Sequence, residues 1–104
     1  MTYYAGDPER NRLIAGLRDL AEFLCQNPQV PAPRYTDLLV FPSRGTDAEM
    51  FAEVDVIAEQ IGVTASQNDT PDRHYIASRY FGPVEYRAVA IPQAARNDHD
   101  EEAE

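Results

Sequence analysis

The stretch HYIASRYFGPVEYRAVAIP, residues His74–Pro92, decides the fold of this chain. Its two arms are rich in tyrosine, valine and isoleucine, which are favoured in strands. Between the arms lies Gly82-Pro83, and a two-residue type II′ turn requires glycine at its first central position. The second central residue of that turn has a negative φ, which proline supplies. The sequence therefore predicts a β-hairpin that turns at this dipeptide.

A two-residue turn also fixes the register, and so the two faces of the hairpin. One face is predicted to carry the pairs Phe81–Val84, Arg79–Tyr86, Ala77–Ala88 and Tyr75–Ala90. The other is predicted to carry Tyr80–Glu85, Ser78–Arg87, Ile76–Val89 and His74–Ile91. We assign the first face to the core, because its alanines let a helix approach closely. The second face combines a polar zone with an apolar strip, and such a face is covered either by the chain itself or by a partner.

Two amphipathic helices are predicted before the hairpin. The first opens at Asp7-Pro8-Glu9, where aspartate can cap and proline suits the first helical position, and ends at Asn27-Pro28. Its apolar stripe consists of Leu13, Ile14, Leu17, Leu20, Ala21 and Leu24. The second helix opens with the capping box Thr46-Asp47-Ala48-Glu49 and ends at Gly62. Its inner stripe consists of Met50, Val54, Ile57, Ala58 and Ile61.

The connecting segments complete the predicted domain. Asn27–Arg34 holds three prolines and is expected to be extended. Tyr35–Phe41 is a predicted strand whose continuous apolar run favours a central strand or one near a covered edge. Gly62–Asn68 is a weaker strand prediction. The order α-β-α-β-β-β predicts an α+β fold, with two helices packed on one face of a four-stranded mixed sheet.

Composition limits the classes of function. A chain of 104 residues is expected to form one domain, residues 1–92, followed by an acidic, disordered tail at 93–104. One cysteine excludes an internal disulfide, and the N-terminus has no signal-peptide pattern, so we expect a cytoplasmic protein. No apolar run approaches the ~20 residues that span a bilayer. The net charge of −9 disfavours direct binding to nucleic acid or anionic lipid.

No catalytic, cofactor or metal site is predicted. The loop Phe41–Asp47 precedes a helix N-terminus and contains Gly45, but its acidic residues would repel a phosphate. Cys25 is interpreted as a packed thiol, because no base is placed beside it. His99 lies between two aspartates in the tail, where no fixed geometry for a metal is expected.

Two stretches, Leu17–Pro33 (LRDLAEFLCQNPQVPAP) and Ser78–Pro92 (SRYFGPVEYRAVAIP), resemble small acidic proteins of actinobacterial genomes, including their phages and integrative elements. That group has no assigned function, so the resemblance implies no functional residue. It implies a cytoplasmic protein of GC-rich bacterial or phage origin.

Three functions follow from the residues as hypotheses. The leading one is a non-enzymatic interaction module, a homodimer joined through the outer hairpin face or the hairpin edge. The predicted interface residues are Ile76, Val89, Ile91, Tyr80 and Arg87. A second hypothesis is an acidic regulator that binds a basic host protein by mimicking nucleic acid, through Glu49, Glu53, Asp55 and Glu59. The third is a small enzyme or ligand-binding protein with a pocket near Tyr80, Arg79 and Arg87.

Overall fold

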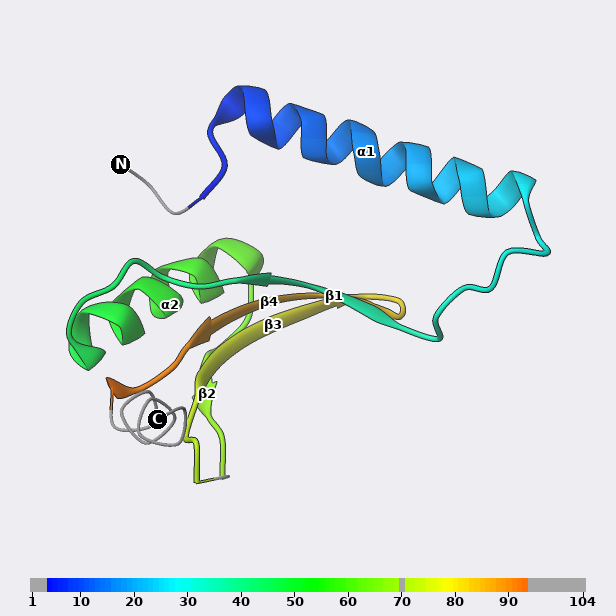
Figure 1. Ribbon diagram of the computed structural model, residues 1–104. Helices are drawn as coiled ribbons and strands as arrows, with labels where there is room; N and C mark the ends of the chain where they lie inside the picture. Colours follow the sequence, from blue (N-terminus) through cyan, green and yellow to red (C-terminus); the bar gives the residue numbers. More distant parts are fainter. Residues whose placement is uncertain (1–3, 70, 94–104) are drawn as a thin grey trace, which may run out of the picture. The chain divides into compact units, whose positions relative to one another are not determined.

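The computed structural model describes residues 4–69 and 71–93, and these form two helices and one four-stranded sheet (Figure 1). The helices are α1 (Asp7–Gln26) and α2 (Asp47–Ile61). The strands are β1 (Thr36–Val40), β2 (Ser66–Gln67), β3 (Tyr75–Phe81) and β4 (Val84–Ala90). The sheet order is β1-β4-β3-β2; β1 runs parallel to β4, and the other neighbours are antiparallel. The predicted α+β class, element order and mixed sheet are confirmed.

The hairpin has the predicted register. Its seven pairs run from Tyr75–Ala90 to Phe81–Val84, as the two-residue turn requires. Gly82 has a φ of +61°, the positive value that the first central position of a type II′ turn demands. The hairpin lies inside the sheet, because β1 pairs with β4 and the short β2 pairs with β3 at Tyr75 and Ile76.

Helix α2 begins and ends where its capping residues predict. The Thr46 hydroxyl accepts from the Glu49 backbone N–H at 3.1 Å, and the Glu49 carboxylate accepts from the Thr46 backbone N–H at 2.9 Å. At the other end Gly62 adopts a left-handed conformation with φ of +74°. This conformation favours glycine because it lacks a Cβ atom.

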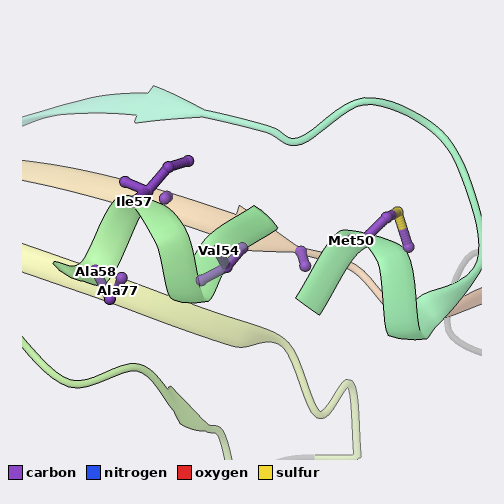
Figure 2. Packing of buried hydrophobic residues seen from close by; sticks show 7 residues of the cluster. Met50, Val54, Ile57, Ala58 and Ala77 are labelled. Atoms are coloured by element: carbon purple, nitrogen blue, oxygen red, sulfur yellow. The ribbon is translucent and has the colours of Figure 1, made fainter. Parts of the chain in front are cut away.

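The core lies between α2 and the face of the hairpin assigned to it. Met50, Val54, Ile57 and Ala58 of α2 pack against Ala77, Ala88 and Ala90, and all are buried (Figure 2). The three strand alanines are completely buried, so the helix packs closely on the sheet, as their small size predicts. Phe51 of α2 stacks on Tyr75 at the border of this core, with ring centroids 4.6 Å apart.

Strand β1 forms one edge of the sheet rather than its centre. Leu39 and the following Phe41 are each 47% exposed. The apolar run at Leu38–Phe41 therefore does not mark a central strand buried on both faces; of the two predicted places, the one at an edge is found. β4 takes the central place, because it pairs with β1 on one side and β3 on the other.

Contacts divide the chain into two compact units, Met1–Arg34 and Tyr35–Glu104. The first contains α1, which is helical over the predicted range and buries none of its residues within that unit; its N-cap is Gly6, so the expectation that Asp7 caps it is wrong. The expected packing of α1 on the sheet and the single domain 1–92 therefore stay predictions. The acidic tail lies outside the described residues except for Gln93, whose backbone N–H donates to Asp47 at 2.9 Å.

Candidate functional site

The candidate site is the face of the sheet opposite α2, here called the outer face. Strand alternation and the observed register place on it residues of three strands. They are Asp37 and Leu39 of β1, Ile76, Ser78 and Tyr80 of β3, and Glu85, Arg87 and Val89 of β4. This face combines apolar and polar groups, as the hairpin sequence predicts.

The centre of the outer face is an ion pair within β4. Glu85 and Arg87 are two residues apart, so both side chains project from the same face. The guanidinium binds the carboxylate in a bidentate manner, with Nη2–Oε1 at 2.7 Å and Nε–Oε2 at 3.0 Å. The Glu85 side chain is only 9% exposed, whereas that of Arg87 is 35% exposed. The carboxylate is therefore enclosed, with the guanidinium between it and solvent.

The surroundings of Glu85 keep it ionised. The hydrogen bonds from Arg87 lower the pKa of Glu85 and outweigh burial, which acts to raise it. Hydrogen bonds from Ser78 and Tyr80 lower this pKa further. In return, Glu85 raises the pKa of Arg87, and Asp37 across the β1–β4 pair adds to this effect.

The predicted interface residues differ in exposure. Val89 is buried, with only 6% of its surface exposed. Its cross-strand neighbour Ile76 is half-buried, as are Ile91 and Arg87. Tyr80 is 66% exposed. The structure thus places four of the five on the outer face of β3 and β4, with Ile91 directly after β4. The most accessible apolar side chains of the outer face are Tyr80 of β3 and Leu39 of β1.

Sequence reasoning missed the contribution of β1 and the central role of Glu85. The spacing of Glu85 and Arg87 along one strand was sufficient to predict their pairing. Asp37 and Leu39 join the site only because β1 lies beside β4, and the strand order is set by contacts between segments far apart in sequence.

The hypothetical ligand site near Tyr80, Arg79 and Arg87 is divided between two faces. Arg79 projects from the core face, where its guanidinium donates to the Ile61 carbonyl at 3.3 Å and lies 5.1 Å from the centre of the Phe81 ring. Arg87 projects from the outer face. The two arginines do not converge on one ligand.

The acidic residues of α2 are largely engaged within the chain. Glu49 takes part in the capping box, and hydrogen bonds from the Thr46 backbone and side chain lower its pKa. Glu53 accepts from the Ser43 backbone N–H, whereas Asp55 accepts from the Tyr75 hydroxyl on β3. The hydrogen bond to Asp55 raises the pKa of Tyr75. Glu59 is exposed, as are Glu49 and Asp55, so an acidic partner face on α2 stays a prediction.

The other candidate groups add no site within the described residues. Cys25 is a free cysteine that its own unit leaves exposed, and its interpretation as a packed thiol stays a prediction, as does the packing of α1. Among residues 4–69 and 71–93, no cluster of three or more histidine, cysteine, aspartate or glutamate side chains is arranged for a metal ion. His99 lies outside those residues. No helix in the described part of the chain has the length and apolar character needed to cross a membrane.

Comparison with protein-family models, curated proteins and solved structures gives no significant match to this chain.

Proposed function

We propose that this chain is a non-enzymatic protein-interaction module that associates with a second copy of itself. The observation that carries the proposal is the surplus of exposed apolar side chains. In the described part of the chain, the large side chains of the core are Met50, Val54, Ile57 and Val89. More large apolar side chains of the same unit, Tyr35–Glu104, are exposed, among them Leu39, Phe41, Tyr80, Phe81 and Val84. Each Å² of apolar surface removed from water contributes about 25 cal/mol of favourable free energy. Association that buries these side chains is therefore favoured.

The chemistry of the outer face supports binding rather than catalysis. A general acid that works near neutral pH needs a carboxyl group with a raised pKa. The pKa of Glu85 is lowered instead, and its two oxygens are occupied by Arg87. The pair therefore serves to neutralise charge at the centre of this face.

Charge limits how two copies can meet. The net charge of −9 repels a second copy unless the contact surface is itself close to neutral. The ion pair between Glu85 and Arg87 satisfies this condition on the outer face. Helix α1 satisfies it as well, since it carries four acidic residues and three arginines.

The solution mass tests this function. Light scattering coupled to size exclusion is carried out on the full chain at low and high salt. We expect a dimer that persists at high salt, because salt screens charge repulsion and does not weaken apolar burial. A monomer at both salt concentrations would contradict self-association.

A further inference from the structure

We draw no further inference here: the strongest candidate, the free edge of β1 in the sheet together with the exposed Leu39 and Phe41, carries none, because nothing in the structure of the described residues shows what covers it.

Discussion

Glu85 is the residue whose environment departs most from that of an ordinary surface carboxylate. It lies on a face that α2 does not cover, yet it is buried. Arg87 binds both oxygens of its carboxylate, and Ser78 and Tyr80 help to lower its pKa. A charge held in this way is stabilised only while its partner is present, because an uncompensated buried carboxylate is strongly unfavourable.

The loss of Arg87 and the loss of Glu85 should therefore lower the free energy of unfolding by different amounts. Arg87→Met keeps the apolar stem but leaves the enclosed carboxylate without its cation, and we expect it to lower the free energy of unfolding by about 1–3 kcal/mol. Glu85→Gln should cost less, since Arg87 is partly exposed and water can solvate its guanidinium. Urea denaturation at pH 7 measures both. Equal losses would contradict the asymmetry of burial.

The lowered pKa of Glu85 also predicts how stability depends on pH. Because the pKa is lower in the folded state than its ordinary value of 4.5, this residue stabilises the fold above that pH. The stabilisation is lost as the pH falls from 4.5 through the folded-state pKa. Between pH 7 and pH 3 the free energy of unfolding should therefore fall less in Glu85→Gln than in the wild type, as denaturation at each pH measures. Glu49, whose pKa is also lowered, continues to contribute in both proteins.

At the scale of elements, α2 is the helix whose boundaries follow most directly from local chemistry. Its capping box and its C-terminal glycine are both short sequence signals with a defined geometry, and both are confirmed. Hairpin register is predictable for the same reason, since the Gly82-Pro83 turn fixes every pair. Local rules suffice where a feature depends on residues that are neighbours in sequence.

The left-handed conformation of Gly62 gives a prediction at this scale. Gly62→Ala places a Cβ atom in a region that L-residues rarely adopt, and we expect a loss of about 1 kcal/mol in unfolding free energy. Gly62→Asn should lose less, because asparagine tolerates this conformation. Thermal unfolding of the two variants gives the comparison. Identical stability of Gly62→Ala and the wild type would show that this helix end does not require the conformation.

The place of β1 shows where sequence reasoning fails. The run Leu38–Phe41 has the apolar pattern of a buried strand, but periodicity records only which groups avoid water and not which strands are neighbours. The strand order depends on pairing between β1 and β4, which are far apart in sequence. As a result, Asp37 and Leu39 could not be assigned to the outer face from the sequence alone.

At the scale of the whole molecule, the core is small. Within the unit Tyr35–Glu104 it consists of α2 on one face of the sheet, and alanines supply much of the strand side. The stripe of α1 was visible in the sequence, but a stripe states that a helix packs and not on what. Its expected contact with the sheet therefore stays a prediction.

The parallel pairing of β1 with β4 also has a consequence for synthesis. Translation proceeds from the N-terminus, so β1 leaves the ribosome well before β4, its neighbour in the sheet. During that interval the backbone of β1 has no partner strand, and Leu39 within β1 and Phe41 just after it have no sheet to pack on. The nascent chain thus passes through a stage in which β1 is open to chaperones or to other nascent chains. Codon changes that slow translation between residues 41 and 84 would lengthen that stage, and we expect them to lower the yield of soluble protein.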